Sequence, residues 1–445
     1  MSERRFDFEI VVVGAGPAGL AAACMAAENG KRVAVVDDTP WLGGQIWRGQ
    51  QARPLVPQAQ KWIERFRRSG ATLLDRTSVI AAPRAGVLLA EHANGPREIH
   101  WDKLILATGA RELFLPFPGW TLPGILGPGG LQSLAKSGWP VSGQRVVVAG
   151  SGPLLLAVAD GLKKLGAKIV SIAEQAQWGR VAGFGATLLA HPAKLAQAAR
   201  IKWRLLGVPY RCGVWPVKAE GDTQIRQVTL TDGQRSWTEA CDLLACGFGL
   251  APNVELPLAL GCELLEGFVW VDAWQATSAA HVYCAGEPTG IGGADCALVE
   301  GQIAGHTASE HKAEAQALFQ ERSRWHEFRS ALARAFALRA ELKSLATADT
   351  LVCRCEDVSL GRMKQFAGWR DAKLQSRCGM GACQGRVCGA AAKVIFGWGM
   401  ESVRPPVLPA RIESLISVAE KESAEGGKAS TGSECRAPAL REYEN

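Results

Sequence analysis

The sequence lacks a segment suited to crossing a membrane or directing export. Its one long apolar run, residues 10–27, is interrupted by Gly14, Gly16, Pro17 and Gly19, which suits a turn better than a membrane helix. The nine residues before it carry three acids against two arginines, whereas an export signal begins with positive charge. We therefore expect a cytoplasmic protein without a transmembrane segment, associated with a membrane only through partners.

Several cysteine, histidine and charge patterns are also missing. Residues 1–350 contain no Cys-x-x-Cys pair, which argues against direct disulfide reduction. The seven histidines form no HxxxH motif and no triad-like arrangement, so no catalytic residue is assigned. The net charge is only +7, and the basic stretches 61–68 and 200–204 contain the apolar residues of a solvated helix face. We expect no nucleic-acid binding.

The chain begins with a strong nucleotide-binding pattern. Its first 36 residues predict a strand, an alanine-rich helix and a second strand, with the G-x-G-x-x-G motif Gly14-Ala-Gly16-Pro17-Ala18-Gly19 at the first turn. Such glycines let backbone amides approach a pyrophosphate, whose negative charge the helix N-terminus favours. Asp37, eighteen residues after the third glycine, is expected to bind an adenosine ribose; Asp38 is the alternative. A turn of the same shape without a ligand is the other interpretation.

A second copy of the pattern is altered. Strand, turn and strand recur over residues 145–174, with Gly150 and Gly152 in the turn and Glu174 at the end. Leu155 replaces the third glycine, which normally permits close helix–strand packing, and this argues against ordinary NAD(P)H binding. Two interpretations remain: the site holds a mononucleotide such as ATP, or only the fold is kept.

The order of these motifs predicts the domain organisation. Thr108 and Gly109 lie between the two nucleotide motifs, whereas Gly286 and Glu287 lie after the second, so the first domain should be completed by a later segment. At 445 residues the chain is long enough for two or three domains. We expect a first nucleotide-binding domain at 1–125 and 275–310, a second nucleotide-binding domain at 126–274, a helical linker at 311–350, a small cysteine-rich domain at 351–405, and an extension at 406–445 that is disordered from about residue 420.

Five of the thirteen cysteines lie within 36 residues: Cys353, Cys355, Cys378, Cys383 and Cys388. Four thiolates that close in space can hold a [2Fe–2S] cluster, which passes one electron at a time. A zinc site built from the same thiolates is the alternative, although zinc ligands are more usually spaced C-x₂₋₄-C than C-x-C. The other cysteines are scattered among apolar residues and are expected to be structural thiols.

The Gly14/Gly16/Gly19 turn, Ala107-Thr108-Gly109 and Ala285-Gly286-Glu287 resemble the flavoproteins with two dinucleotide-binding domains, over residues 8–310. Three further stretches, namely Gly43-Gly44-Gln45-Ile46-Trp47, GSGPLLL and CRCE…GMGACQGRVC, are similar to the large FAD-containing subunit of heteromeric amino-acid dehydrogenases. That group includes opine oxidases, hydrogen cyanide synthase and dye-linked proline and hydroxyproline dehydrogenases. The cysteine segment resembles the [2Fe–2S] domain of the bacterioferritin-associated-ferredoxin type. The resemblance implies an α/β fold with two Rossmann-like domains and a small C-terminal [2Fe–2S] domain.

The resemblance also implies which residues bind the cofactors. FAD would be held by the glycine turn with Asp37 or Asp38, and by Gly44, Gln45, Thr108, Gly109, Gly286 and Glu287. Gly150, Gly152 and Glu174 would frame ATP or another nucleotide, and FMN would lie at a subunit interface. The cluster ligands would be Cys353, Cys355, Cys383 and Cys388, with Cys378 as a spare thiol beside them.

In that family a D-amino-acid-oxidase-like flavoprotein subunit oxidises the amine. The resemblance therefore implies that this chain relays electrons from such a partner to a quinone or protein acceptor. A small ferredoxin-like subunit is a further expected partner, and D-hydroxyproline or an opine is the expected substrate class. Two alternatives are a stand-alone NAD(P)H-dependent flavin and iron–sulfur reductase and a non-catalytic scaffold with vestigial sites.

Overall fold

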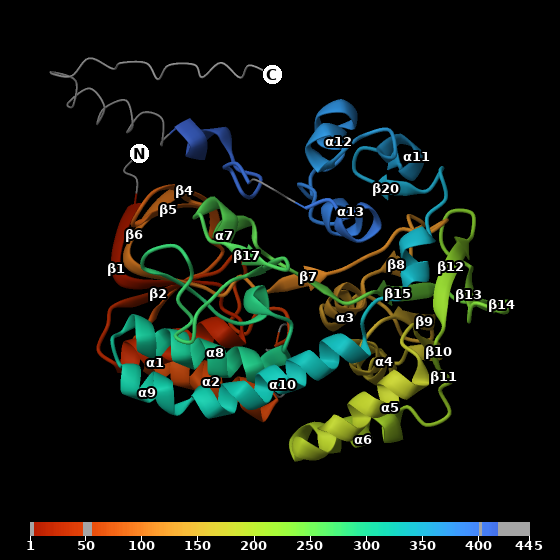
Figure 1. Ribbon diagram of the computed structural model, residues 1–445, viewed down its shortest axis with the longest axis horizontal. Helices are drawn as coiled ribbons and strands as arrows, with labels where there is room; N and C mark the ends of the chain where they lie inside the picture. Colours follow the sequence, from red (N-terminus) through yellow and green to blue (C-terminus); the bar gives the residue numbers. More distant parts are fainter. Residues whose placement is uncertain (1–3, 48–55, 400–402, 417–445) are drawn as a thin grey trace, which may run out of the picture.

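The computed structural model describes residues 4–47, 56–399 and 403–416, and its first domain is built on a seven-stranded sheet (Figure 1). The strands, in sheet order, are β3 (Thr72–Leu74), β2 (Val33–Val36), β1 (Arg4–Val13), β6 (Gly95–Leu106), β5 (Val87–His92) and β4 (Ser78–Arg84), with β19 (Val282–Cys284) paired to β6. All four residues of β2 are buried, as expected for a parallel strand covered on both faces. Since β19 follows the second domain in the chain, the chain leaves this sheet and later returns to it.

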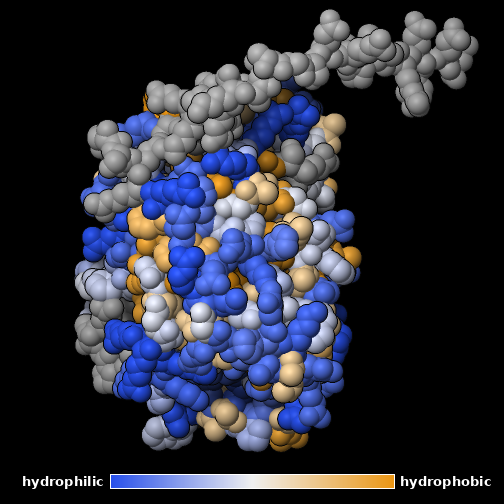
Figure 2. Space-filling model, turned by 90° about the vertical axis from the view of Figure 1, so that its left-hand side faces the viewer, coloured by the Kyte–Doolittle hydropathy of each residue, from blue (hydrophilic) through white to orange (hydrophobic). Residues whose placement is uncertain are grey.

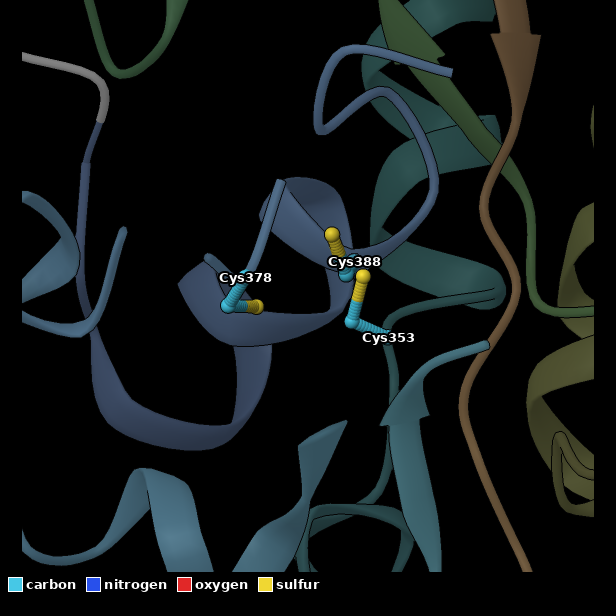
Figure 3. A group of neighbouring side chains, drawn as sticks. All are labelled: Cys353, Cys378 and Cys388. Carbon is cyan, nitrogen blue, oxygen red and sulfur yellow. The ribbon is translucent and has the colours of Figure 1, made fainter. Parts of the chain in front are cut away.

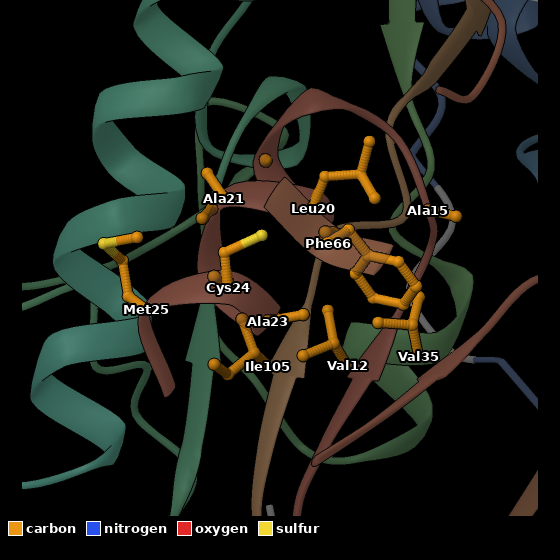
Figure 4. Packing of buried hydrophobic residues seen from close by; sticks show 14 of the residues in the cluster. Val12, Ala15, Leu20, Ala21, Ala23, Cys24, Met25, Val35, Phe66 and Ile105 are labelled. Atoms are coloured by element: carbon orange, nitrogen blue, oxygen red, sulfur yellow. The ribbon is translucent and has the colours of Figure 1, made fainter. Parts of the chain in front are cut away.

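Two helices in backbone contact cover one face of this sheet. They are α1 (Pro17–Glu28) and α8 (Gly293–Ala308), with α2 (Pro57–Arg68) beside α1. A Cβ atom on Gly301 would lie 2.2 Å from the Ala18 carbonyl oxygen, and one on Gly305 would lie 2.4 Å from that of Ala22. Figure 4 shows how α1 packs its small side chains against Val12 and Ile105 of the sheet. Small residues on both helices are therefore a packing requirement.

The second domain contains a five-stranded parallel sheet. Its order is β11 (Tyr210–Cys212), β10 (Lys168–Glu174), β9 (Arg145–Gly150), β15 (Leu243–Gly247) and β8 (Ile125–Leu126). A three-stranded antiparallel sheet packs beside it: β12 (Trp215–Glu220), β13 (Gln227–Thr231) and β14 (Ser236–Ala240). The helices are α3 (Pro128–Lys136), α4 (Leu154–Lys164), α5 (Trp178–Thr187), the 3₁₀ turn η2 (Leu188–Ala190) and α6 (Pro192–Arg204).

Two antiparallel strands, β7 (Ala110–Glu112) and β16 (Leu250–Pro252), carry the chain between the two domains. The chain then re-enters the first domain through α7 (Glu255–Ala259), β17 (Leu264–Leu265) and β18 (Phe268–Val269). After η3 (Glu287–Thr289) and α8 come α9 (Lys312–Ala317), α10 (Phe319–Ala335) and the 3₁₀ turn η4 (Ala340–Ser344). Because α10 contacts α8 as well as α5, the predicted helical linker packs against both domains.

The predicted [2Fe–2S] domain folds as a small unit, here called the cysteine module (residues 351–396). It comprises β20 (Leu351–Cys353), β21 (Val358–Ser359), α11 (Leu360–Met363), α12 (Trp369–Ser376) and α13 (Cys388–Phe396). Beyond it, the Val407 amide donates to the Ile80 carbonyl oxygen of β4. The tail expected to be disordered from about residue 420 lies outside the described residues. None of the helices in the described ranges has the length and apolarity needed to cross a bilayer.

The half-buried Arg111 joins the cysteine module to the strands between the domains. The Arg111 Nε donates to the Arg386 carbonyl oxygen at 3.0 Å, and its Nη1 donates to Asn253 Oδ1 at 2.7 Å. The same guanidinium forms a 2.9 Å ion pair with Glu255. Trp120 adds a second link, since its indole Nε1 donates to the Leu351 carbonyl oxygen at 2.6 Å. The α/β class with two nucleotide-binding domains is thus confirmed, and the cysteines form a small domain of their own.

Replacing Arg111 by Met should loosen this junction. The substitution leaves Glu255 and the Arg386 carbonyl without their partner, at a cost of about 3 kcal/mol. We expect a lower urea midpoint and faster hydrogen exchange in residues 351–396, measured by mass spectrometry. Arg226→Met, which breaks an exposed ion pair with Asp222, is the matched control and should change neither quantity. Equal exchange in the two variants would contradict the proposed role of Arg111.

Candidate functional site

The first glycine turn leaves no room for larger residues at two of its three glycines. A Cβ atom on Gly14, whose φ is +107°, would lie 2.3 Å from the Ala107 carbonyl oxygen. One on Gly19 would lie 1.8 Å from the carbonyl oxygen of Gly14. A Cβ atom on Gly16 would meet no atom of the described residues within 4 Å. The turn is therefore packed against the residue that follows β6 and has room at Gly16 for the pyrophosphate expected there.

Asp37 is anchored beneath this turn. Its Oδ2 accepts a 2.6 Å hydrogen bond from the Ala15 amide, and its Oδ1 accepts bonds from the Thr39 amide and hydroxyl at 2.8 and 2.6 Å. Asp37 is half-buried, whereas Asp38 is exposed. Of the two acids considered for the ribose, the geometry favours Asp37, since it is fixed to the turn that would hold the neighbouring phosphate.

Other residues predicted for this site converge on the same turn. Pro17 and Ala18 open helix α1, and a Cβ atom on Gly286 would lie 2.9 Å from the Ala18 Cβ. A Cβ atom on Gly44 would lie 2.8 Å from the Gly16 Cα, whereas the neighbouring Gln45 is exposed. These contacts bring together segments separated by 270 residues. The predicted FAD site is therefore formed by backbone atoms of several loops that are distant in sequence.

Thr108 and Gly109 face the strands between the domains. The Thr108 hydroxyl donates to the Asn253 carbonyl oxygen at 2.7 Å, and the Asn253 amide side chain donates back to the Thr108 carbonyl at 2.8 Å. The Gly109 carbonyl accepts from the Asn253 backbone amide at 3.0 Å. Thr108 and Gly109 therefore lie next to β7 in the chain, and Arg111 follows Gly109 by two positions.

A buried ionic group that the sequence analysis missed supports the Gly286 turn. Glu300, on α8 and 1% exposed, accepts hydrogen bonds from the Gly286 amide at 2.8 Å and the Thr289 hydroxyl at 3.1 Å. Its other oxygen lies 2.8 Å from His326 Nε2 and 3.3 Å from Arg329 Nη1. The sequence does contain a pattern that could have predicted this group: Glu300 is an acid within an apolar helix, and His326 and Arg329 are three residues apart on another helix.

Glu287 lies at the first position of η3, next to this group. Burial and the nearby negative charge of Glu300 raise the pKa of Glu287 to about 7. A bound ribityl chain would offer hydroxyl groups to this side chain, as the resemblance implies. The role of Glu287 stays a prediction.

The second turn repeats the geometry of the first. Glu174 Oε2 accepts from the Gly152 amide at 2.7 Å, and its Oε1 accepts from the Ala176 amide at 2.8 Å, as Asp37 does with Ala15 and Thr39. A Cβ atom on Gly150 would lie 1.7 Å from the Gly247 carbonyl oxygen. Glu174 is fully buried, and this burial raises its pKa to about 7.

Another part of the chain, here called the covering segment (residues 336–339), is bonded to side chains beside the second turn. The Ser151 hydroxyl donates to the Phe336 carbonyl at 3.1 Å, and the Gln175 side chain donates to the Ala337 carbonyl at 3.2 Å. The Arg339 amide donates to Gln175 Oε1 at 3.2 Å. Side chains beside the turn are therefore bonded within the chain, so the second site fits a dinucleotide less well than the first.

The five clustered cysteines converge in the cysteine module. The sulfur atoms of Cys353, Cys378 and Cys388 all lie within 4.8 Å of one another, and Figure 3 shows them arriving from three separate stretches of chain. Cys355 and Cys388 both lie close enough to Cys383 to shift its pKa. The structure thus places the fifth cysteine, Cys378, in the tight group, while Cys355 is exposed. The predicted set of four ligands stays a prediction.

Hydrogen bonds favour the thiolate at two of these cysteines. Bonds from the thiols of Cys378 and Cys388, and from the Gly379 and Glu356 amides, lower the pKa of Cys353 to about 2. For Cys383, the Cys388 thiol and the amides of Val387 and Gly385 lower the pKa to about 5. Converging thiols with amides directed at sulfur are what an iron–sulfur cluster needs, so the residues fit one.

Replacing Glu287 by Gln should remove a pH dependence of stability. Because the folded-state pKa of about 7 is above the usual 4.5, the stability present below pH 4.5 is lost as the pH rises through 7. Glu287 should account for at most about 3 kcal/mol of the stability that the flavin-free wild type loses over this range, so Glu287→Gln should lose less. Chemical unfolding between pH 4.5 and 8 measures this. Glu287→Asp keeps the carboxyl and should keep the slope; identical slopes in all three proteins would contradict the assignment.

Comparison with known proteins agrees with this geometry. Residues 8–317 match the family model described as pyridine nucleotide-disulphide oxidoreductase. One of the opine oxidase subunits of Rhizobium meliloti is 32% identical, over 93% of this chain and 99% of that protein. The HcnB subunit of hydrogen cyanide synthase from Pseudomonas aeruginosa is 31% identical, over 85% and 90%.

A solved structure extends the fold likeness. L-proline dehydrogenase from P. horikoshii superposes with a TM-score of 0.69 at 18% identity, covering 93% of this chain and 80% of that one. The family fold supports FAD as a cofactor, and the resemblance stated from the sequence is confirmed. The chain belongs to the pyridine nucleotide-disulphide oxidoreductase family, in the group that contains these subunits of opine oxidase and hydrogen cyanide synthase.

Proposed function

We propose that the chain is the FAD- and [2Fe–2S]-containing electron-transfer subunit of a heteromeric amino- or imino-acid dehydrogenase. The relatives are oxidoreductase subunits, which supports a flavin-dependent role within a heteromeric dehydrogenase. The observation that carries the relay is the bond from Arg111 to the Arg386 carbonyl. It fixes the loop between Cys383 and Cys388 against the strand that begins next to Gly109.

The chain's own residues would hold the two redox groups close together. When bound, FAD takes up a hydride and a [2Fe–2S] cluster passes single electrons, so together they convert a two-electron input to one-electron output. Arg111 lies two positions after Gly109 in the chain, so their Cα atoms are at most about 7 Å apart. Glu300, His326 and Arg329 would keep the Gly286 turn in place, while Asp37 would hold the ribose.

The substrate is proposed to react on another chain. The relatives are named as subunits, which supports a division of the reaction between two chains. We propose a D-amino-acid-oxidase-like partner that oxidises D-hydroxyproline or an opine, together with a small ferredoxin-like partner. A quinone or a protein would accept the electrons. FMN is proposed at the interface between subunits and ATP at the second turn.

A stand-alone NAD(P)H-dependent reductase is the second candidate function. The observation in its favour is the second turn, where Glu174 is bonded to Gly152 as Asp37 is to Ala15. Against it stand the covering segment and Leu155, which is buried where the motif normally has glycine.

Mixing the purified chain with NADH or NADPH separates these two functions. We expect no bleaching of the flavin absorbance within the turnover time, because the covering segment bonds to the polar side chains beside the turn. Anaerobic stopped-flow spectroscopy measures this, with dithionite as the positive control. Rapid bleaching by either nicotinamide nucleotide would favour the reductase and contradict the relay.

Serine substitutions test the cluster and its ligands. If Cys353, Cys355, Cys383 and Cys388 are the ligands, each Cys→Ser variant should lose most of its iron, whereas Cys378→Ser should keep about two iron atoms per chain. Iron, zinc and acid-labile sulfide measured on anaerobically purified protein decide this. Iron loss in Cys378→Ser with retention in Cys355→Ser would replace Cys355 by Cys378 as a ligand, and zinc in the wild type would end the proposal.

A further inference from the structure

The helical excursion between β10 and β11 is packed against the protein on one side only. It consists of α5, η2 and α6, here called the outer hairpin (residues 178–206). The η2 turn and α6 bury none of their residues, and α5 buries only Phe184. A helix of thirteen residues is marginally stable in water without packing, so an unburied α6 is unusual.

The inner side of the outer hairpin is firmly attached. Phe184 packs against Phe328 with ring centroids 5.4 Å apart, and His191 stacks on Trp325 at 4.8 Å. Lys194 forms an ion pair with Asp295, in the first turn of α8. These contacts fix the orientation of the hairpin and place its middle beside α8, which begins shortly after the Gly286 turn.

The outer side exposes large apolar side chains. Trp178, Leu189, Trp203 and Leu206 are 62%, 72%, 71% and 66% exposed, within a stretch of 29 residues. Between them lie exposed small residues: Ala182, Ala186, Ala190, Ala193, Ala196 and Ala199. In contrast, the face of the molecule drawn in Figure 2 is predominantly hydrophilic. Concentrated exposure of aromatic and aliphatic side chains marks an interaction surface.

The charge of this surface has one sign. No acidic residue occurs between Glu174 and Glu220. Arg180, Arg200 and Lys202 are exposed and have no ion-pair partner within the described ranges. A second copy of the chain would bring these basic groups together across a twofold axis, which opposes self-association.

The exposed alanines argue for a protein rather than a lipid surface. Small side chains let another backbone approach closely, whereas a helix that inserts into a bilayer surface relies on bulky residues along its apolar face. We propose that the outer hairpin docks a partner subunit whose face is apolar at its centre and acidic at its rim. This inference rests on the heteromeric part of the proposed function and names the surface that the partner uses.

Docking on the outer hairpin would place the partner near the Gly286 turn, which is predicted to contact FAD. Asp295, which holds Lys194 of the hairpin, lies two residues after Gly293, where α8 begins. A partner seated on α6 would therefore lie beside the end of α8 that faces the predicted flavin. That position suits electron entry from a cofactor on the partner.

Native mass spectrometry of the complex, recovered from the source cells through a tag at the amino terminus, tests the proposal. The variant Leu189→Glu/Trp203→Glu should bind the partner about 30-fold or more weakly, as expected when a central aromatic contact is lost. It should appear mainly as the free 47.4 kDa chain with its FAD and iron retained. Trp270→Glu, 42% exposed in the first domain, is the matched control and should give the wild-type complex.

Hydrogen exchange on the wild-type protein gives a second readout that needs no variant. Amides of residues 178–206 should be protected in the complex relative to the isolated chain. Recovery of the intact complex from the double variant, protection elsewhere only, or recovery of the wild type only as copies of itself would overturn the proposal. So would hairpin-dependent binding to phosphatidylglycerol vesicles without any protein partner. A complex that forms through the hairpin but lacks iron would refute the relay and leave the docking surface standing.

Discussion

The half-buried guanidinium group of Arg111 connects the strands between the two nucleotide-binding domains with the cysteine module. Arg111 lies on β7, between the two nucleotide-binding domains, and bonds the cysteine module through the Arg386 carbonyl. Burial lowers the pKa of Arg111, because removing a cation from water is unfavourable. Glu255 and Asn253 offset that cost with charge and hydrogen bonds, so the arrangement is stable only when all its partners are present.

The two nucleotide turns share one internal geometry. Both place an acid at the end of the second strand, bonded to the backbone of the glycine turn. A Cβ atom on Gly16 or on Gly152 would meet no atom of the described residues within 4 Å. The turns differ in their neighbours, since at the second the covering segment bonds Ser151 and Gln175.

Sequence reasoning could predict the parts of the site that depend on local spacing. The G-x-G-x-x-G turn with Asp37, and the convergence of the clustered cysteines, follow from short motifs with a known physical purpose. It could not predict Glu300, His326 and Arg329, which come together only because α10 packs on α8. Nor could it separate Cys378 from its four neighbours, since three sulfurs from distant segments meet only in the folded module. Residues 311–350 were predicted to be a linker, and their contacts with both domains have no signature in spacing.

The central claim is that a one-electron centre lies next to a flavin site in one folded chain. Electron paramagnetic resonance of the anaerobically purified protein, reduced stepwise by light, tests it most directly. The account predicts the signal of a reduced [2Fe–2S] cluster, close to one spin per chain, broadened by a neighbouring flavin radical. Absence of any iron–sulfur signal in flavin-replete protein would contradict it.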